Sequence, residues 1–274
     1  MSLKLMYITN RQDVALVAEK YGVERIWIDL ETLGKEKRQH NMNTVKSYHT
    51  IQDIKRIKPL LTRAEMLVRI NPWNVNSMQE INDVIAAGAD IIMLPMWKTT
   101  EEVNNFLSAV KGRCKTTLLL ETKEAEECLE EVLNQVGIDE IHIGLNDLHL
   151  SYGLSFMFEL LSNGTVEKII KKIKKVGIPY GFGGIARLGY GELPAEKVIM
   201  EHYRLGSTRA ILSRSFCNTD ITTDIEEIDR VFCKSMKELR DYEIEVQKCS
   251  NEKVEKNKED VKRIIMKIVA EKRG

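Results

Sequence analysis

Two acidic residues, Glu121 and Asp147, each follow a short apolar run in the middle of the chain. The runs are residues 117–120 and 138–143, and a segment of helical pattern, residues 123–135, lies between them. This order is typical of a strand–helix–strand crossover, in which two parallel strands present their carboxyl ends at one edge of a sheet. Carboxylates gathered at such an edge suit a divalent cation that prefers oxygen ligands. The spacing therefore predicts a metal site at Glu121 and Asp147.

The rest of the chain repeats the same alternation of apolar runs and amphipathic segments, which must position these two acids. Eight runs alternate with segments of helical pattern, and they are residues 3–8, 25–30, 66–70, 90–94, 117–120, 138–143, 178–182 and 208–212. Eight alternations in one direction favour an α/β fold of the (β/α)₈ TIM-barrel type over a doubly wound sheet. The doubly wound sheet stays open as an alternative, because a count of strands does not show that they close.

The carboxyl-terminal part of the chain is helical in pattern and strongly charged. We expect residues 1–247 to form the barrel as a catalytic domain and residues 248–274 to form a charged helical tail. The tail has one narrow apolar stripe, made of Val261, Ile264, Ile265 and Ile268. Such a stripe predicts packing on the chain's own barrel or contact within an oligomer. A lid or a swapped arm is the alternative.

The composition indicates a soluble globular protein without a nucleic-acid or membrane partner. Of the 274 residues, 43% are hydrophobic and 30% are charged, and 41 basic residues balance 41 acidic ones. No apolar run approaches the roughly 20 residues of a membrane helix. The first residues lack the apolar core of a signal peptide, and the five cysteines lack metal-binding spacing. We therefore expect free thiols and a cytoplasmic location.

Further polar residues are expected at the same end of the predicted barrel as the two acids. In TIM barrels the active site lies at the carboxyl ends of the strands, where Asp29, Glu31 and Arg69 also fall. Each of them alone has a structural explanation, since an acid can cap a helix and Arg69 can neutralise a neighbouring carboxylate. Together with Glu121 and Asp147, they indicate a catalytic site.

Five short motifs in chain order resemble one enzyme family. They are Ile28-Asp29-Leu30-Glu31, Val68-Arg69-Ile70-Asn71, the run from Gly88 to Pro95, Leu120-Glu121-Thr122, and Gly144-Leu145-Asn146-Asp147-Leu148. The series is similar to the metal-dependent hydroxy-oxo-acid aldolases and citrate lyase β-chains, the HpcH/HpaI aldolase type. The resemblance covers roughly residues 27–213 and implies a TIM barrel that is a homo-oligomer.

The resemblance also implies a reaction and roles for the residues. Glu121 and Asp147 would bind Mg²⁺ or Mn²⁺, and an α-oxo acid such as pyruvate or oxaloacetate would chelate that ion. The metal would stabilise the enolate that forms as a carbon–carbon bond breaks or forms. Arg69 would bind the substrate carboxylate, with Asp29 and Glu31 as the base or as holders of water. The backbone around Asn146 would contact the substrate as well.

Thr32 departs from the pattern of the family. Aldolases of this type place a histidine directly after the strand-two acids and the lyases place an acid there, so the position of Thr32 leaves the base unassigned. The basic segment that follows contains Lys35, Arg38 and His49. We expect Lys35 and Arg38 to bind an anionic substrate group and His49, just ahead of a helix start, to serve as the base. A solvated basic loop is the alternative.

A glycine-rich segment after the seventh strand, residues 181–189, supports a second interpretation. Gly183 and Gly184 are predicted to bind substrate through their amides, and Arg187 favours an anion nearby. One alternative function is therefore a phosphate-binding barrel enzyme without an essential metal. Another is a barrel that binds a small acid without catalysis, which the position of Thr32 favours.

Overall fold

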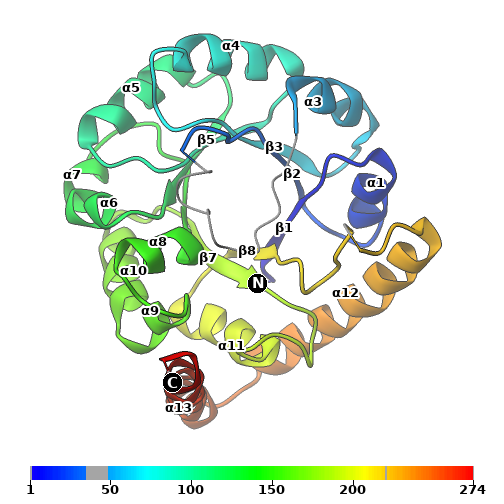
Figure 1. The fold of residues 1–274 in the computed structure, drawn as a ribbon, viewed down its shortest axis with the longest axis vertical. Helices are drawn as coiled ribbons and strands as arrows, with labels where there is room; N and C mark the ends of the chain where they lie inside the picture. The colour runs from blue at the N-terminus through cyan, green and yellow to red at the C-terminus, as the bar shows by residue number, and fades with distance from the viewer. Residues whose placement is uncertain (1, 35–48, 220, 274) are drawn as a thin grey trace.

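The computed structural model describes residues 2–34, 49–219 and 221–273, and it contains a closed barrel of eight parallel strands inside a ring of helices (Figure 1). Each strand pairs with its neighbours in the sequence, and β8 closes the barrel on β1. The prediction of a TIM barrel is confirmed. The strands are β1 (Lys4–Ile8), β2 (Arg25–Asp29), β3 (Glu65–Arg69), β4 (Ile91–Leu94), β5 (Lys115–Leu120), β6 (Glu140–Ile143), β7 (Tyr180–Ile185) and β8 (Arg209–Leu212).

The helices differ from the predicted pattern in two places. The segment predicted as one helix, residues 123–135, forms two short helices, because Cys128 between them has φ −91° and ψ 4°, outside the helical range. Two short helices that the pattern did not predict, α8 and α9, follow β6. The helices are α1 (Gln12–Lys20), α3 (Ile51–Ile57), α4 (Ser77–Ala87), α5 (Thr100–Val110), α6 (Lys123–Glu127), α7 (Leu129–Val132), α8 (Leu145–Ser151), α9 (Glu159–Ser162), α10 (Thr165–Val176), α11 (Ala195–Leu205), α12 (Ile225–Gln247) and α13 (Asn251–Arg273), with a 3₁₀ turn at Lys58–Leu60.

The barrel interior has an apolar middle layer between two polar ends. Side chains alternate along each strand, so one set packs against the surrounding helices and the other fills the barrel. The middle layer consists of Met6, Trp27, Leu67, Ile91, Met93 and Leu119. Charged residues lie below it at the amino ends of the strands and above it at the carboxyl ends. We call the carboxyl end, with the loops that follow each strand, the rim.

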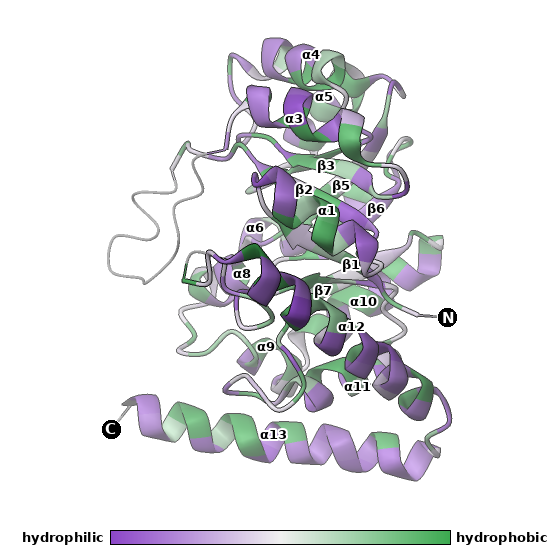
Figure 2. Ribbon diagram, turned by 90° about the vertical axis from the view of Figure 1, so that its right-hand side faces the viewer, coloured by the Kyte–Doolittle hydropathy of each residue, from purple (hydrophilic) through white to green (hydrophobic). Residues whose placement is uncertain are grey.

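The last helix, α13, runs along the outside of the barrel against α9 and α11 (Figure 2). Val261 and Ile265 of its apolar stripe are buried. Its polar contacts are specific, because the buried Asn257 donates to the Lys197 carbonyl at 3.2 Å and to Glu201 at 3.0 Å. The tail thus packs on its own barrel, while the domain boundary at residue 247 and a role in oligomer contact stay predictions. Within the described ranges, no helix has the length and apolar character needed to cross a membrane.

Candidate active site

Glu121 lies at the rim, directly after β5, and its carboxylate is held on two sides. Its side chain is buried, and its Oε1 accepts a hydrogen bond from the Met96 amide at 3.1 Å. On the other side, a Cβ added at Gly144 would lie 2.8 Å from Oε2, so the carboxylate rests against bare backbone. Only glycine gives this approach without a shift. The position of Glu121 is therefore fixed by the two neighbouring loops.

The loop after β4 adopts a backbone conformation that the sequence does not reveal. Met96 has φ 53°, in the left-handed region that residues other than glycine rarely occupy. This conformation accompanies the hydrogen bond from its amide to Glu121. The same loop is tied to the next one, because the Thr122 hydroxyl donates to the Trp97 carbonyl at 2.8 Å. The contacts of Glu121 with Met96 and Gly144 were not predicted from the sequence.

Asp147 lies in the first turn of α8, the helix that begins after Gly144. Strands β5 and β6 pair in parallel, and the Gly144 amide donates to the Leu120 carbonyl at 2.9 Å, so both acids emerge at one edge. Two further contacts join the helices that follow these strands. The Lys123 amide donates to Ser151 at 2.9 Å, and the Tyr152 hydroxyl donates to Glu126. Glu121 and Asp147 thus follow neighbouring strands at one edge of the barrel, while their joint binding of a metal stays a prediction.

Arg69 pairs with the two acids of the second strand and its loop. Its Nε and Nη2 donate to the two oxygens of Asp29, both at 2.8 Å, and Nη2 lies 3.3 Å from Glu31. Burial lowers the pKa of Arg69, but the charges of Asp29, Glu31 and Glu121 outweigh burial and raise it well above its usual value. Nη1 of Arg69 forms no hydrogen bond with any described residue. Asp29 therefore orients the guanidinium and leaves one of its nitrogens for another ligand.

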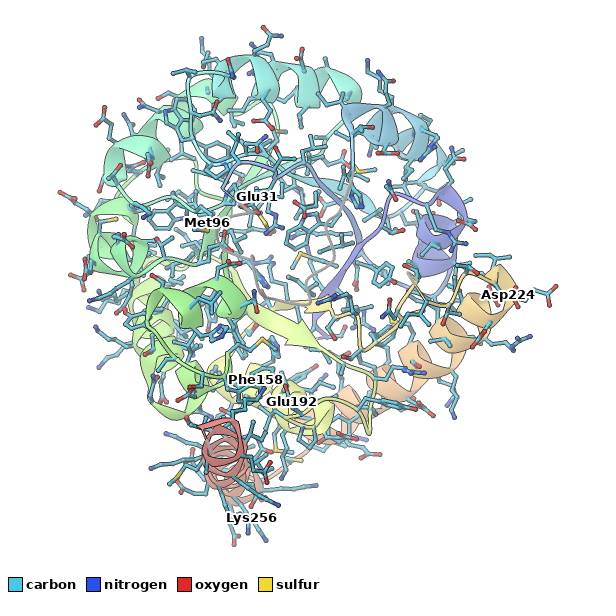
Figure 3. The ribbon with its side chains drawn as sticks, in the orientation of Figure 1. Glu31, Met96, Phe158, Glu192, Asp224 and Lys256 are labelled. Atoms are coloured by element: carbon cyan, nitrogen blue, oxygen red, sulfur yellow. The ribbon has the colours of Figure 1, made fainter. Side chains whose placement is uncertain are left out.

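These acids face the mouth of the barrel. In the view down the barrel, Glu31 and Met96 lie close together near the middle of the ring, whereas Asp224 and Lys256 lie at the periphery (Figure 3). Glu31 and Asp29 are both about 2% exposed. Because Met96 contacts Glu121, the picture agrees with a single group of residues around the mouth, formed by the ends of β2 to β5.

Thr32, the position that departs from the resemblance, has a structural role. Its amide and hydroxyl donate to Asn71 Oδ1 at 2.9 and 3.2 Å, and the Leu33 amide donates to the same atom. Asn71 in turn donates to Glu80 at 2.8 Å, and burial raises the pKa of Glu80. Thr32 and Asn71 hold the loop after β2 to the loop after β3.

His49 contacts the rim through the backbone of β2. Its Nδ1 lies 3.0 Å from the Asp29 amide nitrogen and accepts the hydrogen bond, so this nitrogen is unprotonated. In a neutral imidazole the proton is then on Nε2. The structure thus brings His49 to the predicted site and specifies its tautomer.

Five other residues are predicted to bind substrate, and they lie in three different parts of the chain. Lys35 and Arg38 lie outside the described residues. Asn146 is exposed in the first turn of α8. Gly183 and Gly184 lie within β7, which extends to Ile185 past a bulge instead of ending at residue 182 as predicted.

Packing accounts for the glycines of β7. Gly183 has φ 52°, and a Cβ there would lie 2.7 Å from Leu145 of α8. The absence of a side chain lets α8, which bears Asp147, approach the strand. Substrate binding by Gly183 and Gly184 stays a prediction.

The donors at the rim fit a divalent ion that needs few protein ligands. Within the described ranges, no group of three or more histidine, cysteine or acidic residues is arranged to hold a metal. Mg²⁺ retains several water molecules and is commonly held by one or two carboxylates, so Glu121 and Asp147 match its requirement. A structural zinc site, by contrast, needs four protein ligands.

Comparison with known proteins agrees with this site. The sequence profile described as HpcH/HpaI aldolase/citrate lyase matches residues 4–179. The chain belongs to this family. Family membership supports an enzyme of the aldolase or lyase type. A search of curated protein sequences found no match.

Solved structures of the HpcH/HpaI type share the fold at low sequence identity. The HpcH/HpaI aldolase from Desulfitobacterium hafniense DCB-2 is 13% identical with a TM-score of 0.61, over 83% of this chain and 93% of that one. The citrate synthase SbnG is 14% identical with a TM-score of 0.59, over 84% and 94%. Macrophomate synthase is 15% identical with a TM-score of 0.54, over 77% of each chain. At such identities the likeness establishes the barrel and no particular substrate.

Proposed function

We propose that the protein is a divalent-metal-dependent carbon–carbon lyase or aldolase that acts on an α-oxo acid resembling pyruvate or oxaloacetate. The observation that carries the proposal is the contact of Glu121 with Gly144, at the start of the helix that bears Asp147. This contact, together with the parallel pairing of β5 and β6, supports a site at one edge of the rim to which both residues contribute. Family membership supports the reaction class.

Glu121 and Asp147 would hold Mg²⁺ or Mn²⁺ at the rim. The bound ion would supply Lewis-acid stabilisation of the enolate of the oxo acid. Glu121 is prepared for this role because the Met96 amide occupies Oε1 and fixes the direction of the carboxylate. Support of a ligand by such a hydrogen bond is typical of metal sites.

Arg69 would bind the substrate carboxylate or the developing oxyanion through Nη1. Asp29 occupies Nε and Nη2 and thus holds the guanidinium in one orientation. A positive charge fixed before substrate arrives stabilises negative charge in the transition state without rearrangement. The surrounding acids keep Arg69 protonated, as the direction of its pKa indicates.

His49 would act as the proton donor of the site. The Asp29 amide requires an unprotonated Nδ1, so the neutral ring presents an Nε2 proton that suits donation to an alkoxide during condensation. The accepting role then falls to the acids that follow β2. Because both oxygens of Asp29 are bonded to Arg69, we favour Glu31 as the base.

Exchange of the methyl protons of pyruvate with solvent deuterium tests this function without knowledge of the second reactant. NMR would follow the exchange with Mg²⁺, with Mn²⁺ and with EDTA. We expect exchange only with metal, and we expect Glu121→Gln and Asp147→Asn to abolish both exchange and metal binding measured by calorimetry. Glu124→Gln is the matched control, since Glu124 is an exposed residue of α6 paired with the surface residue Lys98.

Other outcomes would favour the alternatives. Exchange that persists in EDTA would contradict the metal-dependent mechanism and favour a metal-free barrel enzyme. If pyruvate and oxaloacetate raise the unfolding temperature but neither exchanges protons nor breaks down, the protein is a non-catalytic barrel that binds small acids.

A further inference from the structure

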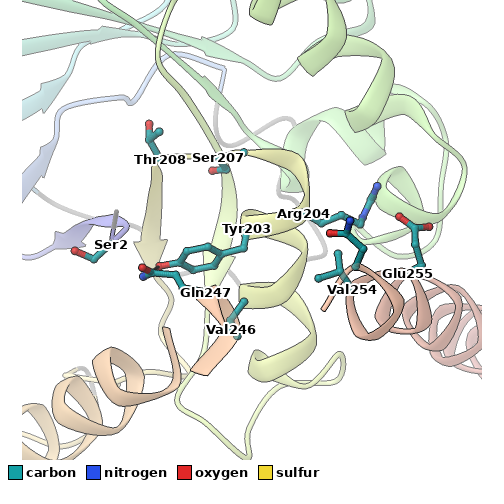
Figure 4. Close-up of a pocket in the computed structure, with 11 residues that line it drawn as sticks. Ser2, Tyr203, Arg204, Ser207, Thr208, Val246, Gln247, Val254 and Glu255 are labelled. Atoms are coloured by element: carbon teal, nitrogen blue, oxygen red, sulfur yellow. Dashed lines mark hydrogen bonds between the residues drawn. The ribbon is translucent and has the colours of Figure 1, made fainter. Parts of the chain in front are cut away.

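The helix α13 extends along the outside of the barrel from its amino end to the rim. Its first turns line a cavity of about 550 Å³ together with Ser2 and Thr208, which precede β1 and β8 (Figure 4). A helix of 23 residues is about 35 Å long, which is enough to reach the opposite end of the barrel (Figure 2). The family profile matches only as far as residue 179, so α13 lies outside the part of the chain that identifies the family.

At the rim, Lys272 in the last turn of α13 has two contacts. Its Nζ lies 2.8 Å from a carboxylate oxygen of Glu192, in the loop after β7. The same ammonium group lies over the ring of Phe156, 5.1 Å from the ring centroid, in the segment that joins α8 to α9. In the view down the barrel, Phe158 and Glu192 both lie on the inner side of α13 (Figure 3). Lys272 therefore joins the loops that follow β6 and β7.

The segment that Lys272 contacts is connected to the helix that bears Asp147. The ring of Phe156 is buried, so it is part of the packing beneath the lysine. Two residues before Phe156, the Leu154 amide donates to the carbonyl of His149 in α8 at 2.9 Å. Asp147 lies two residues earlier in the same helix. A displacement of Phe156 would therefore reach α8 through the main chain.

The middle of α13 is anchored independently of Lys272. Val261 and Ile265 are buried against the barrel, and Lys197 of α11 pairs with Asp260 at 2.8 Å. Even Ile265 lies about two helical turns before Lys272. The contacts of Lys272 can therefore be removed without detaching the helix from the barrel.

We propose that α13 is a strap whose last turn restrains α8, with Lys272 as a positioning residue for the proposed metal ligand Asp147. This inference rests on the proposed function for its effect on metal binding. The contact with Glu192 holds the ammonium group over the ring of Phe156. An ion pair at the surface and a partly exposed cation–π contact are each weak, so the strap should adjust metal affinity without determining it.

Amide hydrogen exchange, followed by mass spectrometry on the full chain, tests the restraint directly. In Lys272→Gln, peptides from residues 145–162 should exchange at least threefold faster than in the wild type, because local opening is no longer opposed by the strap. Lys272→Arg should restore the wild-type rate, since a guanidinium can stack on the ring and pair with Glu192. Lys267→Gln is the matched control, because Lys267 is 80% exposed and pairs with Glu271 of the same helix.

Titration with Mg²⁺ tests the link to the proposed site. We expect Lys272→Gln to weaken Mg²⁺ binding, measured by calorimetry, by about three- to tenfold, the range that two weak contacts can supply. Pyruvate exchange should fall by the same factor at limiting Mg²⁺ and return to the wild-type rate at saturating Mg²⁺. Phe156→Leu should have a similar effect, and the double variant should lose little more than Phe156→Leu, because both changes remove one contact.

Three results would contradict this inference. Amide hydrogen exchange in Lys272→Gln that equals that of the wild type, or of Lys267→Gln, would overturn the strap. Faster amide exchange with unchanged affinity for Mg²⁺ would overturn the positioning role. Loss of Mg²⁺ affinity that Lys272→Arg does not restore would overturn the assignment to the contacts of the lysine.

Failure of the proposed function gives a different result from failure of the strap. If the function is wrong, the wild type itself binds no Mg²⁺ and exchanges no pyruvate protons, while amide hydrogen exchange in Lys272→Gln still reports whether α13 restrains α8. If only the strap is wrong, Glu121→Gln loses metal binding and Lys272→Gln behaves as the wild type. Unfolding temperatures measured without metal establish that each variant folds.

Discussion

Strands β2 and β3 have an arginine paired with an acid at each of their two ends, in opposite order. At the amino end Arg25 lies opposite Glu65, and at the carboxyl end Asp29 lies opposite Arg69. The same register and the same two residue types thus occur twice, one strand length apart. The two pairs differ in the charges around them. These charges favour a structural role for the pair at the amino end and a catalytic role for the pair at the carboxyl end.

The amino-end pair belongs to a group of charges that we call the floor cluster, made of Arg25, Glu65, Lys115, Glu140 and Arg209. Arg25 is fully buried and donates to both oxygens of Glu140, at 2.5 and 2.6 Å. Burial lowers the pKa of Arg25, but Glu140 and Glu65 outweigh it and raise the pKa. With three basic and two acidic residues, the floor cluster has partners for all its acids.

The rim has the opposite balance. Its described part holds four acids, Asp29, Glu31, Glu121 and Asp147, around one arginine, Arg69. A bound cation would neutralise the excess of acids in this described part of the rim. The pairing of an arginine with an acid therefore does not identify a site, because the same pair occurs at both ends of β2 and β3. The balance of charge around the pair does.

Removal of the floor arginine should give the largest effect on stability. Arg25→Met leaves Glu140 buried beside fewer positive charges, and loss of one partner from a buried ion pair costs about 3–5 kcal/mol. Denaturant unfolding would measure the change. Lys115→Met is the control, because its side chain is 54% exposed and its ion pair with Glu65 should contribute at most about 1 kcal/mol. Equal losses in the two variants would contradict the structural role of the floor cluster.

The matching change at the rim should affect activity instead. Arg69→Lys retains the charge but cannot donate to both oxygens of Asp29 and also to substrate. We expect metal-dependent pyruvate exchange to fall by about 100-fold, as when one donor to a developing oxyanion is removed. The free energy of unfolding should change less than in Arg25→Met. Normal exchange with reduced stability in Arg69→Lys would show that Arg69 has a structural role, as Arg25 does.

The sequence predicted the barrel because the barrel depends on local patterns. Eight apolar runs with helical segments between them are visible without tertiary information, and the crossover after residue 120 brings Glu121 and Asp147 to one edge in any parallel sheet. Arg69 and Asp29 were predictable as residues of the rim for the same reason, since each ends its strand.

Contacts between distant residues were not predictable in this way. The left-handed backbone at Met96 and the approach of Gly144 to Glu121 depend on how separate loops pack. The hydrogen bond of His49 to the Asp29 amide specifies a tautomer that no pattern reveals. The break at Cys128 likewise divides a segment whose apolar spacing indicates one helix.

A buried histidine between the two ends should make stability depend on pH. Burial and the charge of Arg209 lower the pKa of His142 from 6.5 to about 3, and burial lowers that of His202 similarly. Between these values the unfolded chain binds protons that the folded chain does not, so stability falls as pH decreases from about 6.5. Each histidine contributes at most about 1.4 kcal/mol per pH unit.

Denaturant unfolding at pH 7, 6 and 5 would measure this dependence. His142→Gln should remove about half of the pH dependence of the unfolding free energy that the two buried histidines cause, because His202 remains. Pyruvate exchange by the folded protein should not follow the titration of His142, because the charges that shift its pKa are those of Arg209 and Arg25 in the floor cluster. A slope that His142→Gln leaves unchanged would show that burial of this histidine is not the origin of the pH dependence.

Two glycine substitutions should give the smallest effect on activity. They should also distinguish most clearly between the role of the rim in activity and the role of the floor cluster in stability. At Gly144 the backbone accepts alanine, with φ −81°, but the new methyl group would meet the Glu121 side chain at 2.8 Å. We expect Gly144→Ala to displace Glu121, the proposed metal ligand, and to reduce exchange by up to about tenfold, because small displacements of catalytic groups lower the rate. At Gly181 the methyl group would meet the Arg209 carbonyl at 2.3 Å, so Gly181→Ala should lower stability instead. The Arg209 carbonyl is backbone and cannot move aside as the Glu121 side chain can. The two variants should therefore differ in unfolding free energy even if both lose activity. Identical losses of unfolding free energy and of activity in the two variants would contradict the different roles of the floor cluster and the rim.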